Sequence, residues 1–301
     1  MNIKKKITGL ILSMLLSSGV AVAADFDKGL EAHSSGDYKT AIAEWTPLAE
    51  QGHIAAQLNL GVMYFHGNGA IENGKTAVKW FTMGAEQGEP HAQMYLGFAH
   101  LNGKGVLQND KIAMKWFTKA AEQGNIESQF QLGRMYYSEN IQASAKWYTK
   151  AAEQGEVRAK TMLATMYYEG VGVLQNLKTA VRWYTEAAKQ GNFVAQNNLG
   201  TMYDVGEGVP ESDKTAVKWY TLAAEQGYTG AQNSLGLMYQ HGAGVLTDNR
   251  RAYMWYNLAS YNGSEDAGES KDKLAKDMTL ADISKAQDMS SRCLESNYTD
   301  C

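Results

Sequence analysis

Apolar residues along this chain recur with the spacing of α-helices. In residues 213–227, Ala216, Trp219, Tyr220, Ala223 and Ala224 stand at i, i+3, i+4, i+7 and i+8, which places them on one face of a helix. The segment AQNNLGTMY (195–203) has the same helical spacing, and the polar loop DVGEGVPES (204–212) separates the two segments. The pattern therefore predicts a pair of amphipathic helices joined by a loop.

The same pair of segments recurs along most of the chain. The second helix of each pair ends in a variant of KWYTLAAEQG, whose final glycine stands at 52, 88, 124, 155, 191, 227 and 263. Successive glycines are 36 residues apart, except for one interval of 31. A period in this range is typical of solenoids, in which stacked helix pairs bury one another's apolar faces. We predict an all-α solenoid of about seven helix-turn-helix repeats over residues 24–263.

Local signals mark both ends of each second helix. The glycine that follows the last turn can adopt the left-handed conformation of a helix C-terminus without steric cost. The residue before the first turn has a side-chain oxygen that can accept a free backbone N–H. These N-cap candidates are Asp37, Asn73, Asn109, Asn140, Asn176, Ser212 and Asp248. The helix ends are thus predicted independently of the apolar pattern.

Two positions of the repeat are restricted in size. Tryptophan recurs in the second helix, at 80, 116, 147, 183, 219 and 255, and we assign Trp45 to the same position. A small residue recurs inside the first helix, at Gly61, Gly97, Gly133, Ala164, Gly200 and Gly236, although glycine costs about 1 kcal/mol there. We predict that the tryptophans wedge between neighbouring helices and that the small residues let two helix backbones approach closely. A carbohydrate-binding platform is the alternative role for the tryptophans.

These recurring positions resemble the Sel1-like repeat (SLR), a relative of the tetratricopeptide repeat. The match to A-x-x-x-L-G-x-M-Y-x-x-G-x-G-V, followed by A-x-x-W-Y-x-x-A-A-x-Q-G, extends over residues 25–263. The first repeat departs from it with the short first helix FDKGLEAHSSG, and the repeat that contains YYSENIQASAKWY lacks five residues of the loop between its helices. The resemblance implies a right-handed α-solenoid that acts as a protein-interaction scaffold, often in bacterial envelope or signalling processes.

The first 23 residues have the features of a signal peptide. Lys4, Lys5 and Lys6 precede a mostly apolar stretch, 7–20, and Ala21-Val22-Ala23 provides an A-x-A cleavage motif. We predict export, to the periplasm or as a secreted protein, with the mature chain starting at Ala24 or one residue later. An uncleaved membrane anchor is the alternative, although the apolar stretch is short for a span.

After Gly263 the period ends, and residues 264–301 are expected to form a helical cap. Two helices are predicted, in SEDAGESKDKLAKD and in TLADISKAQDMSSRCLESNY, the second with Thr279 as N-cap and Asp282 in its first turn. A solenoid needs such a cap to cover its last apolar face. Cys293 and Cys301, the two cysteines of the chain, lie here. An even number of cysteines in an exported protein favours a disulfide within the chain, and pairing between chains or free thiols are the alternatives.

Charge and composition give no general reason to expect a nucleic-acid or lipid partner. The formal net charge is −4, whereas proteins that bind phosphate backbones or anionic lipids carry an excess of basic residues. No later segment approaches transmembrane length, so no stable span is expected after signal cleavage. The six histidines are scattered, and two cysteines without a nearby histidine cannot complete a zinc shell. We expect no metal and no cofactor, and the G-x-G pairs are interpreted as turns.

An enzyme is the main alternative to a binding module. Some cysteine-rich secreted relatives in the family that the chain resembles have been linked to β-lactam binding and hydrolysis. They carry paired cysteines in every repeat, and this chain has none within its repeats. Ser270 and Lys273 match S-x-x-K, but the companion motifs S-D-N and K-T-G are missing. We predict no enzymatic activity, and a peptidoglycan ligand is the alternative among binding functions.

The predicted function is that of an exported scaffold that binds a protein or peptide. In a helix-pair solenoid the first helices line the concave side, which such proteins use to hold partners. Two positions of the first helix fall between the packing positions, and the pair of residues at them differs in every repeat. They are Asn59, Val62, Tyr95, Phe98, Gln131, Arg134, Met162, Thr165, Asn198, Thr201, Ser234 and Leu237. Tyr95, Phe98 and Arg134 are the strongest candidates, because exposed aromatic and arginine side chains tend to dominate binding energy.

Overall fold

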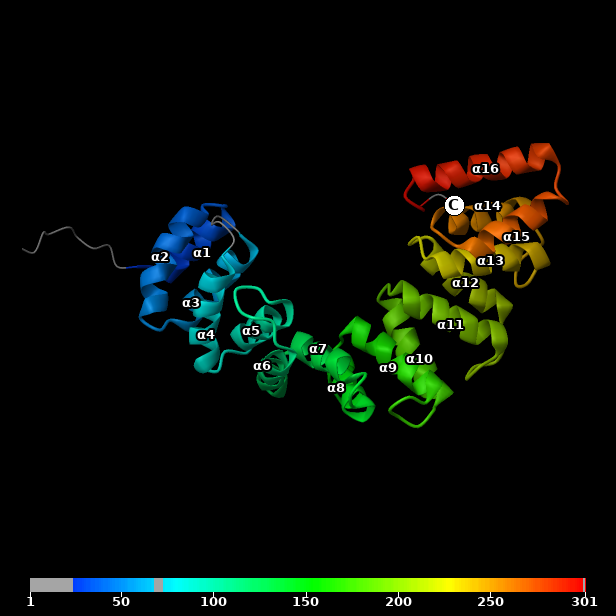
Figure 1. The fold of residues 1–301 in the computed structure, drawn as a ribbon. Helices are drawn as coiled ribbons and strands as arrows, with labels where there is room; N and C mark the ends of the chain where they lie inside the picture. The colour runs from blue at the N-terminus through cyan, green and yellow to red at the C-terminus, as the bar shows by residue number, and fades with distance from the viewer. Residues whose placement is uncertain (1–23, 68–72, 300) are drawn as a thin grey trace, which may run out of the picture. The chain divides into compact units, whose positions relative to one another are not determined.

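The computed structural model describes residues 24–67, 73–299 and 301, and its regular structure in these ranges is α-helical (Figure 1). The first helices of successive repeats are α1 (Phe26–Ser34), α3 (Ile54–His66), α5 (Pro90–Asn102), α7 (Ile126–Tyr136), α9 (Val157–Glu169), α11 (Phe193–Val205) and α13 (Thr229–His241). The second helices are α2 (Tyr38–Glu50), α4 (Gly74–Glu86), α6 (Asp110–Glu122), α8 (Ile141–Glu153), α10 (Leu177–Lys189), α12 (Asp213–Ala224) and α14 (Asn249–Tyr261). Two further helices, α15 (Glu265–Ala275) and α16 (Leu280–Glu295), follow. The prediction of an all-α solenoid is confirmed.

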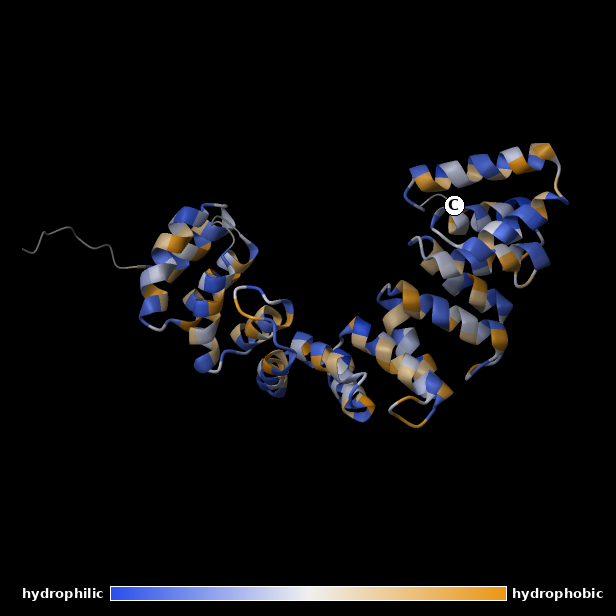
Figure 2. Cartoon of the chain, viewed as in Figure 1, coloured by the Kyte–Doolittle hydropathy of each residue, from blue (hydrophilic) through white to orange (hydrophobic). Residues whose placement is uncertain are grey.

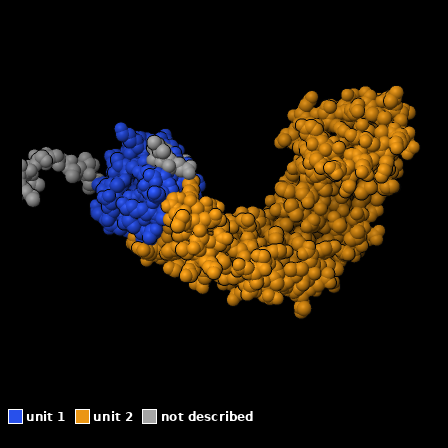
Figure 3. Space-filling view, in the orientation of Figure 1, with its two compact units in different colours: residues 1–84 blue, residues 85–301 orange. Residues whose placement is uncertain are grey.

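Two compact units divide these helices, residues 1–84 and residues 85–301 (Figure 3). The first unit contains α1 to α3 and nearly all of α4, and the second contains the remaining helices. Hydrophobic and hydrophilic residues alternate along individual helices (Figure 2), as expected for helices that bury one face. The predicted signal peptide lies outside the described residues.

The predicted ends of the second helices are confirmed by their cap geometry. All seven N-cap candidates, from Asp37 to Asp248, accept a backbone N–H of the following helix with a side-chain oxygen. The glycines that follow these helices, from Gly52 to Gly263, have left-handed φ angles between 78° and 99°. Each helix boundary is therefore determined by residues within one turn of it and does not depend on contacts between repeats.

The small residues of the first helices make room for an aromatic ring. A Cβ atom added to Gly133 would lie 2.5 Å from the ring of Tyr148, and one added to Gly200 would lie 2.7 Å from the ring of Tyr220. The same arrangement occurs between Gly61 and Phe81, between Gly97 and Phe117, and between Gly236 and Tyr256. Our prediction that these residues let two backbones approach closely is therefore wrong. The ring of the second helix occupies the space that a side chain would need.

The ring in this contact belongs to the residue after the recurring tryptophan. Trp45 also lies at this ring position, because a Cβ atom on Gly29 would collide with the Trp45 side chain. The sequence register agrees, since Trp45 and Phe81 each stand seven residues before the glycine that ends their helix. Our assignment of Trp45 to the tryptophan position is therefore wrong. Tyr184, at the ring position of α10, is 2% exposed, and burial of so large a side chain contributes about 1.5–3 kcal/mol to stability.

The tryptophans themselves pack between repeats, as predicted. Trp147 of α8 packs against a cluster that includes Phe117 and Leu132 from the two preceding helices. Basic side chains of the same helix cover the outer face of several of these rings. The Lys119 ammonium, for example, lies 4.3 Å from the centroid of the Trp116 ring, a distance at which a cation is attracted to an aromatic face.

Buried glutamines of the first helices bond to a backbone carbonyl of the preceding repeat, and the sequence analysis missed them. Gln196 of α11 is 4% exposed. Its amide nitrogen donates to the Ala188 carbonyl of the preceding repeat at 3.1 Å, and its amide oxygen accepts from Gln226, after the second helix of its own repeat, at 2.8 Å. The same bond within a repeat joins Gln93 to Gln123, Gln129 to Gln154, and Gln232 to Asn262. In α9, Lys160 takes the place of the glutamine, and its ammonium lies 3.1 Å from the Glu186 carboxylate.

The two C-terminal helices pack against α14, the last helix of the repeats. Ala267 and Leu274 of α15 and Ala286 of α16 are buried in one cluster with Tyr253 and Tyr256 of α14. The predicted N-cap of α16 is confirmed, since the Thr279 hydroxyl oxygen accepts the backbone N–H of Asp282 at 3.2 Å. These contacts cover the apolar face of α14 that no further repeat buries.

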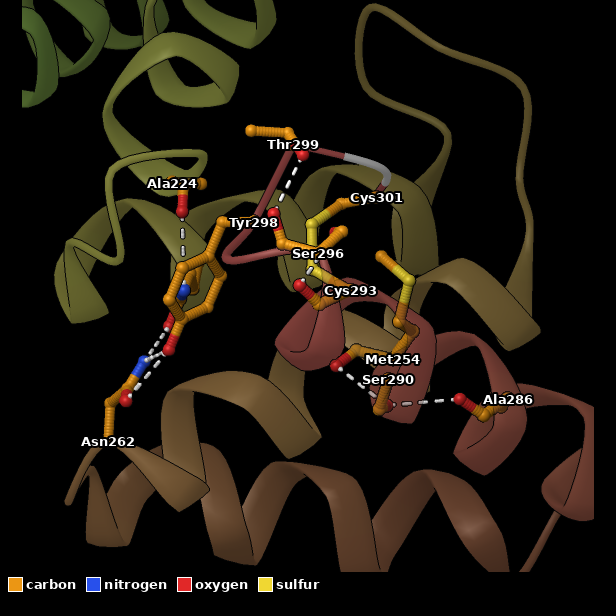
Figure 4. Close-up of a disulfide and its surroundings, with 11 residues drawn as sticks. Ala224, Met254, Asn262, Ala286, Ser290, Cys293, Ser296, Tyr298, Thr299 and Cys301 are labelled. Carbon is orange, nitrogen blue, oxygen red and sulfur yellow. Dashed lines mark hydrogen bonds between the residues drawn. A yellow bond between two sulfur atoms is a disulfide. The ribbon is translucent and has the colours of Figure 1, made fainter.

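A disulfide within the chain joins Cys293 to Cys301, whose Cα atoms are 4.7 Å apart (Figure 4). The bridged loop carries Tyr298 back onto the repeats, where its hydroxyl donates to the Asn262 side-chain oxygen at 3.1 Å. Asn297 and Tyr298 have positive φ angles of 51° and 66°, a conformation that is unfavourable for residues other than glycine. The disulfide and the contact with Asn262 hold the loop in this conformation.

We predict that Gly200→Ala destabilises the protein by about 1–3 kcal/mol, because the added methyl group would overlap the Tyr220 ring. Helix propensity alone predicts the opposite sign, a gain of about 1 kcal/mol. Chemical denaturation of single and double variants separates the two effects. In a Tyr220→Ala background, Gly200→Ala should become neutral or stabilising, and an unchanged cost there would contradict the ring contact.

We also predict that Cys301→Ser lowers the free energy of unfolding of the cap by roughly 2–3 kcal/mol, because the unfolded loop is no longer closed. Cys301 is exposed, whereas Cys293 is buried, so this variant removes the bridge without placing a hydroxyl in the core. Hydrogen exchange should accelerate at residues 293–299 and stay unchanged in α5 to α12. Ser291→Ala, at an exposed position of α16, is the control. Equal exchange in both variants would mean that Tyr298 stays in place without the disulfide.

Candidate partner-binding site

The twelve predicted binding residues lie on α3, α5, α7, α9, α11 and α13, two on each helix and one turn apart. We call the side of each unit formed by the first helices the first-helix face. Eleven of the twelve side chains are half-buried or exposed. Gln131 differs, since it is 5% exposed and its amide bonds to Glu127 and Arg134. That these residues contact a partner stays a prediction.

A cavity of about 210 Å³ opens on this face between α9 and α11. The side chain of Tyr184, on α10, also lines the cavity, and its hydroxyl lies 2.8 Å from the Thr165 hydroxyl. The Asn198 amide nitrogen donates to the Tyr184 oxygen at 3.1 Å. The lining residues are Thr165, Tyr168, Glu169, Tyr184, Asn198, Thr201 and Met202. Three of the predicted residues therefore share one cavity, and the sequence analysis missed Tyr168, Glu169 and Tyr184.

A second cavity, of about 240 Å³, lies in the first unit at the equivalent place in the repeat. It is lined by Leu30, His33, Trp45, Asn59 and Val62. Trp45 corresponds to Tyr184 and Asn59 to Asn198, as their distances from the glycine that ends the second helix show. Leu30 and His33 were missed because α1 is short, so its sequence could not be aligned with the first helices of the other repeats. Gly29, which packs on Trp45, is the signal that could have revealed it.

Large or charged side chains occupy the corresponding positions in the third and fourth repeats. The Phe98 ring makes an edge contact with Phe117, with centroids 5.1 Å apart and planes at 82°. Arg134 is exposed, and its guanidinium donates to the Gln131 side-chain oxygen at 3.1 Å. Burial raises the pKa of Tyr95 above its usual value. The first helices therefore carry side chains of different size and charge at equivalent positions of the repeat.

Tyrosines at the ring position supply hydroxyl groups to the first-helix face. The Tyr220 hydroxyl donates to the Thr201 hydroxyl at 3.1 Å, and the Tyr256 hydroxyl donates to the Gln240 side chain at 2.7 Å. Burial raises the pKa of Tyr148 and of Tyr256 to about 12. These groups stay protonated near neutral pH and act as hydrogen-bond donors and acceptors.

No cluster of three or more histidine, cysteine or acidic side chains that could hold a metal is found in the part of the chain that the structure describes. Within the same residues, no helix has both the length and the apolar character needed to cross a membrane. Ser270 and Lys273, the S-x-x-K match, lie on α15, and the Lys273 ammonium is 3.9 Å from the Glu269 carboxylate.

Comparison with known proteins identifies the repeat. The family model described as Sel1 repeat matches residues 54–89, 90–125, 126–156, 157–192, 194–228 and 229–264. The chain belongs to the Sel1 repeat family. Scaffolds of this family generally mediate protein–protein interaction, without enzymatic activity. The six matched segments begin and end with the helix pairs, and the atypical first repeat precedes them.

Two solved structures show how the Sel1 repeats of this chain compare with others. A Sel1 repeat protein from Oxalobacter formigenes is 30% identical, with a TM-score of 0.68 over 79% of this chain and 97% of that one. The protein c5321, a protective antigen present in uropathogenic Escherichia coli strains and displaying an SLR fold, is 28% identical. Its TM-score is 0.60 over 91% of this chain and 69% of that one. Among curated proteins, none matches the chain.

We predict that the buried tyrosines make the protein sensitive to alkaline pH. Burial raises the pKa of Tyr148 to about 12, above the value of about 10 for a tyrosine in an unfolded chain. Its contribution to the free energy of unfolding is therefore complete below pH ~10 and is lost as the pH rises toward about 12. Tyr148→Phe should reduce the loss of stability between pH 9 and pH 11, as measured by urea denaturation. Tyr261→Phe, at a side chain that is 73% exposed, should leave it unchanged.

Proposed function

We propose that this Sel1 repeat protein is an exported scaffold that binds a protein or peptide segment along its first-helix face. The observation that carries the proposal is the pair of cavities at the same place in two repeats, one between α1 and α3 and one between α9 and α11. Both are bounded by positions that vary between repeats. Surface concavities with a few polar groups are the usual sites of ligand contact.

The distribution of sequence variation supports this face over the opposite one. The leucine of the first helix is kept in every repeat from Leu60 to Leu235 and is buried each time. The two binding positions next to it carry a different pair of side chains in every repeat. Residues released from packing can recognise different parts of one extended partner, as in other solenoids with long binding surfaces.

Two features of the chain favour export. The basic and apolar segment that ends in Ala21-Val22-Ala23 has the order of a signal peptide. Disulfides persist in oxidising compartments and are rare in the cytosol, so the bond between Cys293 and Cys301 favours an exported protein. The partner is therefore expected among proteins of the bacterial envelope or its surroundings.

A capture experiment tests the binding face. The purified protein is incubated with an envelope extract of its own source, and bound proteins are quantified by mass spectrometry. Arg134→Ala combined with Leu237→Ser changes two exposed side chains of the first-helix face. It should reduce capture at least about tenfold, because arginine side chains tend to dominate binding energy and a leucine adds buried apolar area. Phe98 is left unchanged because its loss would also remove the contact with Phe117.

The control is matched in residue type and exposure. Lys115→Ala combined with Leu222→Ser changes exposed side chains of α6 and α12, and Leu222 is 44% exposed against 45% for Leu237. This variant should capture the same proteins as the unmodified chain. Loss of capture in the control with retention in the first variant would move the site to the second helices.

A further inference from the structure

The cavity between α9 and α11 has the size of a subsite for one side chain. Its volume of about 210 Å³ is below the range of about 300–1,000 Å³ typical of pockets for small-molecule ligands. Thr165, Tyr168 and Glu169 form one wall, and Asn198 and Thr201 form the other. A long side chain that projects from a peptide on the first-helix face would fill such a space.

The hydroxyl hydrogens in this cavity are already used within the protein. The Thr165 hydroxyl donates to the Thr161 carbonyl at 3.1 Å, so in its contact with Thr165 the Tyr184 hydroxyl must be the donor. The Thr201 hydroxyl donates to the Asn197 carbonyl at 3.2 Å. These three oxygens keep lone pairs but have no free hydrogen. The cavity therefore favours a group that donates hydrogen bonds.

One carboxylate, that of Glu169, lines the cavity, and no lysine or arginine is among its lining residues. Glu169 is exposed at the end of α9, and its carboxylate has no ion-pair partner within the described residues. Tyr168 donates to the Glu207 carboxylate at 2.7 Å. A negative potential of this kind attracts a cationic group and repels an anionic one.

The equivalent cavity in the first unit shows that this charge is not a general property of the repeat. Leu30 stands where the other cavity has Thr165, and Val62 stands where it has Thr201. No carboxylate lines that cavity. The acidic character at α9 and α11 thus arises from side chains that the fold does not require.

We infer that the cavity between α9 and α11 binds a lysine or arginine side chain of the partner segment, with Glu169 as its ion-pair partner and the Tyr184, Thr165 and Thr201 oxygens as hydrogen-bond acceptors. This inference rests on the proposed function, because it names the chemistry of the segment that the first-helix face holds. Ammonium and guanidinium groups are donors only, which matches the lone pairs and the charge of the site.

A peptide selection tests the inference without knowledge of the natural partner. A phage library of random 12-residue peptides is selected on the purified full-length chain, and the enriched peptides are sequenced. We expect lysine or arginine at one recurring position. Replacing that residue by methionine in a synthetic peptide should weaken binding at least about tenfold in fluorescence anisotropy, as for a charge pair at an interface.

Variants of the protein assign the effect to the cavity. Glu169→Gln should weaken binding of the basic peptide about tenfold. Binding of the methionine peptide should stay nearly unchanged, because that peptide has no ion pair with Glu169 to lose. Glu153→Gln, at an exposed glutamate of α8 outside the cavity, should bind both peptides like the unmodified chain. Enriched peptides without a basic residue, or equal weakening by Glu153→Gln, would overturn the inference and leave peptide binding standing. No enrichment at all would overturn the proposed function as well.

Discussion

The contact between one aromatic ring and one glycine, found in every repeat except that of α9, determines how the first and second helices sit together. Because a Cβ atom on Gly133 or Gly200 would collide with the ring, the ring itself is the spacer between the two helices. The same contact brings the end of the side chain to the first-helix face. Tyrosine at this position supplies a hydroxyl there, as Tyr184 does, whereas Phe117 supplies none. One packing position therefore also determines the polarity of the surface above it.

Features that depend on a few neighbouring residues could be predicted from the sequence. The N-caps and the glycines after each second helix followed from local chemistry, since a short polar side chain or a glycine acts within one turn. Repetition added a second source of information, because a position kept in every repeat must meet the same neighbours each time. The helix pairs, the all-α solenoid and the helices of the C-terminal cap were accessible for these reasons.

Contacts between repeats were harder to predict, because they depend on which of two adjacent residues faces the neighbour. In each second helix, the recurring tryptophan and the residue after it are both aromatic. Trp45 was wrongly assigned to the tryptophan position, although it corresponds to the residue after it. The buried glutamines were missed because a polar side chain such as Gln196 suggests a solvated surface. Its burial is possible only because the Ala188 carbonyl and Gln226 satisfy its amide. The cavities depend on side chains from three helices, so the sequence indicated some of their residues but not their enclosure.

Helix α9 departs from the repeat pattern at the positions that elsewhere hold neighbouring helices together. Lys160 replaces the linking glutamine and pairs with Glu186, and Ala164 replaces the glycine beneath the ring. The methyl group of Ala164 fills the space that the ring takes beside the glycines of the other repeats, so the Tyr184 ring cannot pack on α9 in the same way. The acidic cavity occurs at this same point, between Thr165, Tyr184 and Asn198. Departures from an otherwise regular pattern are expected where residues serve function and not packing, which is the physical reason to seek the partner's anchor at α9.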